Sequence, residues 1–287
     1  IKEPFKGLFT QGMVCHETYK DQDNNWRSPE EVTSEDGKKF FLKSEKNHKI
    51  QVGSSESMSK SKKNTIDPEK IIKLYGADAV RLFILSDSPP EKDVQWSEEG
   101  IASAFKFIQK LWNLNIKFLE EIKKNHLEDS DNELEKSTNI FLKNVNKNLE
   151  NFSYNKIVAN LHEMYSFLFN EIKNNYSKDT LLENYKKILI TIMPIIPHFS
   201  NECLYLLNQK EEFKWPGYDE SILIEEYFNL VIQINGKKRG LIKVKKNIDE
   251  SEIMNEIKKE ENLQKYFKEN QIKKKIYIPN KLINIII

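Results

Sequence analysis

The spacing of hydrophobic and polar positions divides the chain into four regions. Residues 1–56 combine an apolar stretch at 8–14 with a polar, turn-rich segment at 21–38 and a Ser/Gly-rich segment at 52–57. This mixture predicts strands and loops that belong to a larger domain and lack a core of their own.

The next segment carries the start and stop signals of two short helices. Asp67 is placed to cap a helix in which Pro68 takes the first position, and Gly76 allows the left-handed conformation that ends it. Asp78 is placed to cap a second helix at 79–85. The apolar contacts of the first helix are expected from Ile71, Ile72 and Leu74.

From about residue 98 to residue 207 the apolar positions follow the period of an α-helix. Separate apolar faces occur over 101–118, 134–149, 157–172, 181–193 and 197–207. Helices of this length joined by short loops predict an antiparallel helical bundle.

The last region changes period. Apolar and polar residues alternate over 229–244 around Asn235-Gly236, a strong signal for a β-hairpin turn. A helical pattern covers 251–267, and strands are expected at 274–278 and 282–287. Residues 229–287 therefore predict a small α+β module at the end of a mainly α chain.

Composition excludes several classes of protein. The 31% charged and 38% hydrophobic content argues against a mostly disordered chain, and no run of about 18 apolar residues predicts a membrane span. Cys15 and Cys203 are too far apart in sequence to suggest a disulfide scaffold or a zinc knuckle, which favours a reducing, cytoplasmic compartment. The start lacks both Met and an apolar leader, which indicates a piece of a longer protein without a secretory signal.

The overall formal charge of +1 hides an asymmetry. Residues 229–287 hold 14 basic and 7 acidic residues, an excess of +7, whereas residues 1–228 hold 31 basic and 37 acidic residues. A basic unit behind an acidic body suggests a polyanionic partner such as nucleic acid. A solvated Lys-rich surface, produced by the Lys, Asn and Ile bias of the whole chain, is the alternative.

The segment at 57–64 (SMSKSKKN) holds the candidate chemistry. It predicts a flexible loop, introduced by Gly and Ser, in which ammonium groups and hydroxyls could hold the oxygens of a transferring phosphate. Such a loop can close over a triphosphate from outside. An exposed loop enriched in Lys and Ser by composition alone is the alternative.

This loop and its surroundings resemble the class I aminoacyl-tRNA synthetases, and in particular the leucyl-tRNA synthetases of the bacterial type. The resemblance is carried by MSKSKKN at 58–64, DP at 67–68, YGADAVRL at 75–82, TQGMV at 10–14, SPPEKD at 88–93, Trp96 and NGKKRG at 235–240. It runs through essentially the whole chain, with the motifs in order and at matching spacing.

Two departures from that family bear on the chemistry. The family loop usually begins with a lysine, but Ser57 stands at that position, so the contribution of the first lysine is lost or passes to Lys62 or Lys63. The His-Ile-Gly-His type motif and the editing domain, which the family places upstream, do not occur. The chain therefore resembles the carboxy-terminal part of the enzyme, starting late in the catalytic domain.

The resemblance implies a two-step reaction for the intact enzyme. Leucine carboxylate attacks the α-phosphorus of ATP, and a terminal ribose hydroxyl of leucine tRNA then takes the leucyl group. Lys60 would be the catalytic residue that stabilises the pyrophosphate leaving group, and the ATP-binding residues would be Met58, Ser59, Lys60 and Ser61. Magnesium is expected with ATP in the full-length enzyme, whereas this piece alone is expected to bind no cofactor, hold no metal and be inactive.

The family also implies a domain plan and an RNA partner. Residues 1–56 would end the catalytic domain, 57–97 would form the signature loop with its helices, 98–228 the anticodon-side bundle, and 229–287 a tRNA-binding module. The expected tRNA contacts are Lys237, Lys238 and Arg239, and Lys273, Lys274 and Lys275. The two clusters would share one face if the strands pair suitably. The partner would be leucine tRNA, the enzyme would be monomeric and would not contact a membrane, and a stand-alone tRNA-binding module without catalysis is the alternative.

Other chemically suggestive residues have simpler explanations. Neighbouring residues at 15–17 (CHE) on a strand point to opposite faces, which argues against a metal site. His198 is expected near a helix start with a local partner, and Trp96, Trp112 and Trp215 are expected in the core or an interface. Asp78 and Arg81, three residues apart, are expected to form an ion pair on a helix surface.

Overall fold

A computed structural model describes residues 4–5, 7–34, 36–45, 47–124, 126, 129, 131–208, 213–223, 227–245, 248–267 and 272–287. The chain forms two compact units, which divide between Tyr218 and Asp219. The sequence predicted the terminal module to begin at 229. Phe213 and Tyr218 still pack on the helical core of the first unit, and the first strand of the second unit begins at Tyr227. No helix in the ranges just given is long and apolar enough to cross a bilayer.

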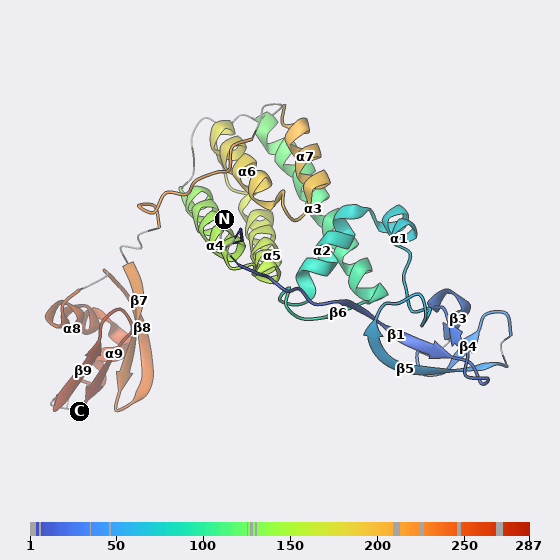
Figure 1. Cartoon of the computed structure of the whole chain (residues 1–287). Coiled ribbons are helices and arrows are strands. Elements are labelled where there is room, and N and C mark those ends of the chain that lie inside the picture. The colour runs from blue at the N-terminus through green and yellow to red at the C-terminus, as the bar shows by residue number, and fades with distance from the viewer. Residues whose placement is uncertain are drawn as a thin grey trace. The chain divides into compact units, whose positions relative to one another are not determined.

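The first unit opens with a small, mostly antiparallel sheet, in which β1 and β5 lie side by side (Figure 1). Its elements are β1 (Val14–Lys20), β2 (Trp26–Arg27), the 3₁₀ turn Pro29–Glu31, β3 (Val32–Ser34), β4 (Phe40–Leu42), β5 (Lys49–Ser57) and β6 (Val94–Gln95). The strands follow the order β2-β1-β5-β4-β3, and β6 pairs with β1 in parallel. The Ser/Gly-rich segment at 52–57 forms the second half of β5, which ends where the candidate loop begins.

This sheet has its own small core, contrary to the sequence-based expectation for residues 1–56. Tyr19, Val32, Leu42 and Ile50 are buried together, with Phe40 and Val52 packed against them. The core forms because the strand pairs β3–β4 and β4–β5 fold back on β1.

Pairing of β1 with β6 brings two sequence motifs together. The Gly12 amide donates to the Pro90 carbonyl at 2.8 Å, and the Met13 amide donates to the Asp93 carboxylate at 2.8 Å. The segments 10–14 and 88–93 are thus neighbours although about 80 residues separate them. Their contact is close: a Cβ added at Gly12 would lie 2.1 Å from the Lys92 carbonyl oxygen.

We therefore expect Gly12→Ala to destabilise the first unit by about 1–3 kcal/mol, because the obstructing atoms belong to backbone and cannot rotate away. Urea unfolding followed by circular dichroism measures this change. Gly217→Ala is the matched control, since nothing lies within 4 Å of the added Cβ there. Equal stability of the two variants would contradict the close approach.

The two short helices follow the loop. In α1 (Pro68–Tyr75) the Asp67 carboxylate accepts from the Glu69 amide at 3.0 Å, and Gly76 ends the helix with φ of 81°, as the sequence predicted. Of the predicted apolar contacts, Ile71 packs on the core, but Ile72 and Leu74 are exposed. The second helix, α2 (Ala77–Asp87), starts before Asp78, so Asp78 lies inside the helix and is not its cap.

The helical bundle is confirmed. Its helices are α3 (Glu98–Lys124), α4 (Glu133–Glu150), α5 (Tyr154–Glu171), α6 (Lys178–Ile192) and α7 (Pro197–Leu206). A short turn at 151–153 joins α4 to α5, and the two helices pack against each other (Figure 1). The buried face of α3 includes Phe107 and Leu114, while Trp112, which the sequence placed on that face, is 36% exposed.

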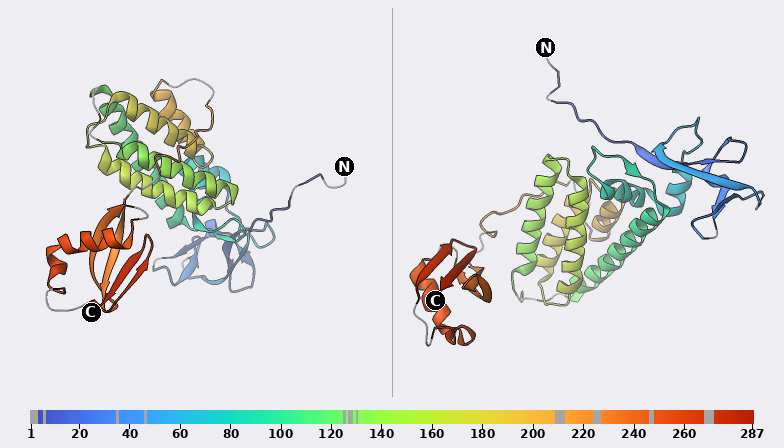
Figure 2. Two further views of the ribbon diagram at one scale, coloured as in Figure 1. Left: turned by 90° about the vertical axis from the view of Figure 1, so that its left-hand side faces the viewer. Right: turned by 90° about the horizontal axis from the view of Figure 1, so that it is seen from below.

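The second unit is an α+β module, as the sequence predicted. Its elements are β7 (Tyr227–Ile234), β8 (Lys237–Lys245), α8 (Glu250–Lys259), α9 (Glu261–Gln264), β9 (Lys274–Ile278) and β10 (Leu282–Ile286). Asn235 and Gly236, both with positive φ, form the predicted hairpin turn. The helix expected at 251–267 is broken at Glu260, whose extended backbone separates α8 from α9. Figure 2 shows α8 lying along one side of the sheet.

Candidate functional site

The candidate phosphate-binding loop connects β5 to α1 and is fixed at its start. Strand β5 ends at Ser57, and the Met58 amide donates to the Val14 carbonyl at 3.2 Å. The loop therefore leaves the sheet at a defined point beside β1.

One buried side chain holds the base of this loop. Asn64 is fully buried, and its carbonyl oxygen accepts from the Ser59 amide at 2.8 Å. Its amide group donates to the carbonyls of His16 and Glu56 at 3.2 Å each, and to that of Ser57 at 3.5 Å. A single amide thus ties together β1, the end of β5 and the loop.

Asn64→Ala should cost about 2–3 kcal/mol of stability, because the half-buried Ser59 amide and the strand carbonyls lose their partner. The loop should also lose its fixed start, which makes its backbone amides exchange faster. Urea unfolding and hydrogen exchange of residues 58–63 measure the two effects. Asn47→Ala, at an exposed position, serves as the control, and a loss no larger than that of the control would refute the role given to Asn64.

The hydroxyls of the loop interact with each other. Ser59 Oγ lies 3.3 Å from Ser61 Oγ and accepts from the Lys62 amide at 3.3 Å. Ser59 is half-buried, while Ser61 is exposed. The loop therefore curls around the Ser59 side chain.

The three lysines of the loop differ in their surroundings. The Lys62 ammonium forms an ion pair with Glu56, and this hydrogen bond and charge hold the pKa of Glu56 below its ordinary value. The pair persists until pH falls through that lowered pKa. Lys60 and Lys63 are exposed and have no ion-pair partner within the part of the chain that the structure describes. Their ammonium groups are therefore the ones available to an external anion.

Asp78 and Arg81 do not form the expected ion pair. The Asp78 carboxylate accepts from the backbone amides of His198, at 3.3 Å, and Phe199, at 2.7 Å. Arg81 donates to the carbonyls of Pro194, at 2.6 Å, and Ile195, at 3.1 Å. Both side chains of α2 thus bind the junction between α6 and α7.

Asp78 is the cap of α7 rather than of α2. The N-cap residue of α7 is Ile196, which has no side-chain oxygen, so the first amides of that helix depend on Asp78. His198 lies near the helix start as predicted, and its Nδ1 is 2.9 Å from Asp78 Oδ1.

The two basic clusters of the terminal module lie on opposite edges of its sheet. The strand order is β8-β7-β10-β9, so Lys237, Lys238 and Arg239 fall on one edge, and Lys274 and Lys275 on the other, directly after Lys273. The register aligns them: Lys237 is opposite Ile234, and both Ile234 and Lys275 are opposite Ile285. The clusters therefore share one end of the sheet but two parallel strands separate them.

Each cluster is also divided between the two faces of the sheet. Lys237 and Lys275 occupy the same row as the buried Ile234 and Ile285, and Lys275 forms an ion pair with Glu250 at 3.0 Å. Arg239 lies 5.3 Å from the ring of Tyr266. Lys238 and Lys274 alternate with these positions, so they belong to the face opposite the buried residues. The clusters as wholes therefore do not share one face, the arrangement that the sequence had made conditional on strand pairing.

That open face carries an apolar row between lysines. Leu241, Val231, Leu282 and Ile278 are aligned across the four strands. Leu241 and Ile278 are exposed, and so is Ile276 in the next row. Lysines follow on both sides of this row: Lys238 and Lys274 on one, Lys243 and Lys245 on the other.

The remaining sequence candidates have structural surroundings, and Cys15 lies opposite Ser57 at the start of the loop. Cys15 is buried in β1, and burial, with the neighbouring Asp93 carboxylate, raises the pKa of its thiol. Trp96 packs against Phe83 as predicted. Trp112 and Trp215 are more exposed than expected, and the Trp215 indole donates to Asn146 at 2.7 Å.

Sequence comparison adds the protein class to this geometry. A family profile described as "tRNA synthetases class I (I, L, M and V)" matches residues 49–97, which include the loop and both short helices. A second profile, "Anticodon-binding domain of tRNA ligase", matches residues 131–254. The loop region and much of the helical bundle are therefore similar to parts of class I aminoacyl-tRNA synthetases.

Individual relatives narrow the class. The leucine–tRNA ligases of Bartonella quintana and Orientia tsutsugamushi are each 40% identical to the chain over its full length. Over its whole length the chain is therefore similar to the carboxy-terminal part of leucine–tRNA ligases. It spans about a third (34%) of the length of these curated relatives.

A solved structure shares the fold. It is the ternary complex of Agrobacterium radiobacter K84 agnB2 LeuRS with tRNA and LeuAMS, which matches with a TM-score of 0.67 at 21% identity. The match covers 80% of this chain and 31% of that chain.

Proposed function

We propose that the chain is the carboxy-terminal part of an enzyme that activates leucine with ATP and transfers it to leucine tRNA. The 40% identity to leucine–tRNA ligases over the whole chain carries this proposal. The loop at 58–64 supports it, because its start is anchored to the sheet while Lys60 is left without an ion-pair partner among the described residues.

Lys60 acts in the first step. When the leucine carboxylate attacks the α-phosphorus of ATP, the bond to the pyrophosphate oxygen breaks and negative charge grows on the leaving group. The ammonium of Lys60 stabilises that charge. Met58, Ser59 and Ser61 complete the ATP-binding segment, with the curled backbone and hydroxyls around Ser59 close to the phosphates.

The missing first lysine of the signature is not replaced by Lys62, because the ammonium of Lys62 is neutralised by Glu56. Lys63 is exposed and is the remaining candidate for that contribution.

Magnesium would accompany ATP in the full-length enzyme. The described residues hold no group of three or more His, Cys, Asp or Glu that fits a metal ion, so no step is assigned to magnesium through this chain.

In this proposal the first two regions complete the catalytic domain and the last two bind RNA. Residues 1–56 end the catalytic domain, 57–97 carry the signature loop, 98–228 form the anticodon-side bundle and 229–287 a basic tRNA-binding module. Lys238 and Lys274, on the open sheet face, are well placed to contact phosphates together, whereas Lys237, Arg239, Lys273 and Lys275 contact RNA from the edges. The enzyme works as a monomer in the cytoplasm, and its leucine site and second ATP signature lie in the upstream half.

A binding module without catalysis is the second candidate, and the basic end unit favours it. The loop argues against it, because a pure binding module has no use for an anchored leaving-group clamp. The isolated chain should give no pyrophosphate exchange, since the upstream half of the ATP site is missing. Pyrophosphate exchange by this chain alone would contradict the proposal that the ATP site also needs residues from the upstream part of the enzyme.

A chimaera tests the proposed function. The corresponding third of the Bartonella quintana ligase is replaced by this chain, and charging of leucine tRNA with leucine is measured. The proposal predicts an active chimaera whose activity falls when Lys60 is changed to Ala. A folded chimaera that forms leucyl-adenylate but never charges tRNA would contradict the RNA-binding role, and one that fails at adenylate formation would contradict the role of the loop.

A further inference from the structure

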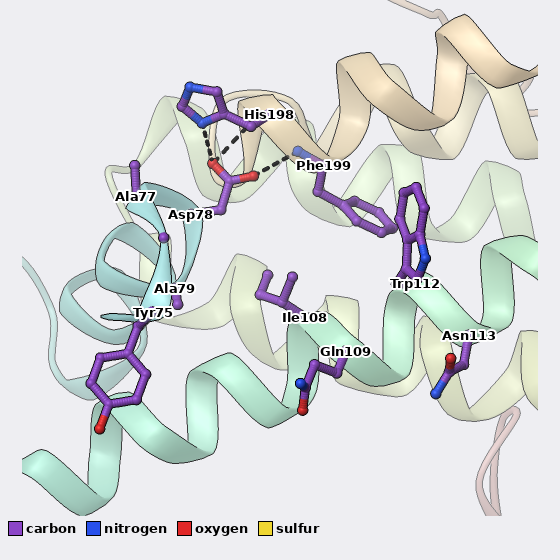
Figure 3. A pocket seen from close by; sticks show the side chains of 11 residues that line it. Tyr75, Ala77, Asp78, Ala79, Ile108, Gln109, Trp112, Asn113, His198 and Phe199 are labelled. Atoms are coloured by element: carbon purple, nitrogen blue, oxygen red, sulfur yellow. Dashed lines mark hydrogen bonds and ion pairs between the residues drawn. The ribbon is translucent and has the colours of Figure 1, made fainter. Parts of the chain in front are cut away.

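A pocket of about 770 Å³ lies between α2, α3 and the start of α7 (Figure 3). Its volume is within the range of small-molecule sites. The walls combine aromatic rings and aliphatic side chains with two amides, an imidazole and the Asp78 carboxylate, and none of these residues has a role in the proposed chemistry. The residues on which the argument rests are Tyr75, Ile108, Gln109, Trp112, Asn113 and His198.

Helix α3 presents two parallel rows to this pocket. Ile108 and Trp112 are four residues apart and form an apolar row, and Gln109 and Asn113 form an amide row beside it. Figure 3 shows Ile108 pointing toward the space between α2 and Phe199, with Trp112 beside Phe199. The rings of Trp112 and Phe199 meet edge to face at 6.4 Å. A flat molecule can therefore rest one face on the apolar row while its edge meets the amides.

The polar groups of the pocket are available. Gln109 and Asn113 are exposed, and their side-chain amides have no hydrogen-bond partner among the residues that the structure describes. Trp112, at 36% exposure, shows part of its ring to solvent. Each amide offers both a donor and an acceptor, which is the combination that reads the edge of a nucleobase.

His198 adds an oriented group at the opposite wall. Its Nδ1 is held 2.9 Å from the Asp78 carboxylate, which fixes the ring and leaves Nε2 free, and its side chain is 76% exposed. Figure 3 shows the ring standing out from the start of α7. This ring supplies one further hydrogen-bonding position.

The charge of the pocket restricts its ligand. Asp78 is the one carboxylate among the lining residues, and its two oxygens already accept from the backbone amides of His198 and Phe199 and lie beside the His198 imidazole. A carboxylate at this position disfavours a phosphate inside the pocket, and its occupied oxygens leave little for a cation. A neutral, planar, hydrogen-bonding ring fits best.

We propose that this pocket takes an unpaired nucleobase of the bound tRNA. The inference rests on the proposed function, which supplies RNA as the partner. Sequence-specific RNA recognition uses unstacked bases that lie on aromatic side chains and hydrogen-bond along their edges. Here the base stacks on Trp112, its edge meets Gln109 and Asn113, and its phosphate stays outside.

The test uses the 287-residue chain labelled with 5-fluorotryptophan. Its tryptophans give separate fluorine NMR resonances, which single Trp→Phe variants assign. Nucleoside monophosphates at millimolar concentration should shift the Trp112 resonance, whereas ribose 5-phosphate and inorganic phosphate should not. Trp215, at 45% exposure, is the internal control and should stay unchanged.

Substitution of the amides tests the geometry. Gln109→Ala and Asn113→Ala should each weaken nucleotide binding about fivefold, the effect of one hydrogen bond, while Asn47→Ala leaves it unchanged. No shift at Trp112, or an equal shift with ribose 5-phosphate, would overturn the proposal.

A titration with leucine tRNA separates this inference from the proposed function. A Trp112 shift that the Gln109→Ala variant diminishes supports both. Binding of tRNA that leaves Trp112 unaffected rejects the pocket and preserves the tRNA-binding role. A response to mononucleotides without any binding of tRNA rejects the proposed function and leaves a base-binding pocket without its assigned RNA.

Discussion

Lys60→Ala lowers leucine-dependent pyrophosphate exchange by about 10²–10³ in the full-length enzyme, the usual effect of removing one preorganised contact to a developing charge. The loss should appear in kcat, because the ammonium acts on charge that grows as the bond to pyrophosphate breaks. Folding should be unaffected, since Lys60 is exposed and makes no ion pair with a described residue. Exchange kinetics and a thermal melt measure the two expectations.

Lys63→Ala is the matched control for Lys60, because it removes another exposed ammonium from the same loop. A smaller loss there would locate the clamp at Lys60, and a comparable loss would show that Lys63 supplies the contribution of the missing first lysine. An unchanged exchange rate in Lys60→Ala would end its assignment as the catalytic residue.

Asp78→Ala destabilises the first unit by about 2–4 kcal/mol, the largest expected loss of stability. The substitution removes a buried carboxylate that caps α7, and it leaves two backbone amides at the start of that helix without their partner. Ile196 cannot take over, because its side chain has no acceptor. Urea unfolding with a linear extrapolation gives the value.

Asp87→Ala is the control for this change. It lies at the exposed end of the same helix, where an acidic residue interacts unfavourably with the helix dipole, and its carboxylate accepts from the Ser88 hydroxyl at 3.1 Å. Its stability should stay within about 0.5 kcal/mol of the parent chain. A similar, small loss in both variants would show that α7 does not depend on Asp78.

Local patterns in the sequence were sufficient for α1, the helices of the bundle and the terminal hairpin, but they missed the break between α8 and α9. The signals that define α1 and the hairpin turn, Asp67 with Gly76 and Asn235 with Gly236, act on their own neighbours. The bundle follows from helical periodicity, which is repeated often enough to be unambiguous. These features therefore need no knowledge of distant contacts.

The errors arose where a partner lies far along the chain. Asp78 caps a helix 120 residues away, so its spacing to Arg81 suggested the wrong partner. The two lysine clusters were expected on one face, but the order of β8, β7, β10 and β9 depends on non-local pairing. Sequence spacing alone contains neither fact.

The loop was recognised, but its anchor was not. Asn64 is one asparagine in an Asn-rich chain, and nothing local indicates that it would be fully buried against three strand carbonyls. Gly12 belongs to the TQGMV segment at 10–14. Its close approach to the Lys92 backbone depends on the pairing of β1 with β6, which local sequence does not indicate.

The most direct test of the account is binding of leucine tRNA to this chain across a salt series, compared with an unrelated tRNA and with a chain that ends at Tyr218. We expect preference for leucine tRNA, with affinity that falls steeply with salt, and a marked loss of both affinity and salt slope on truncation, because the removed unit contains residues 229–287 with their 14 basic and 7 acidic residues. Binding that truncation leaves unchanged, or no binding by the folded chain, would contradict the assignment of the terminal module to tRNA.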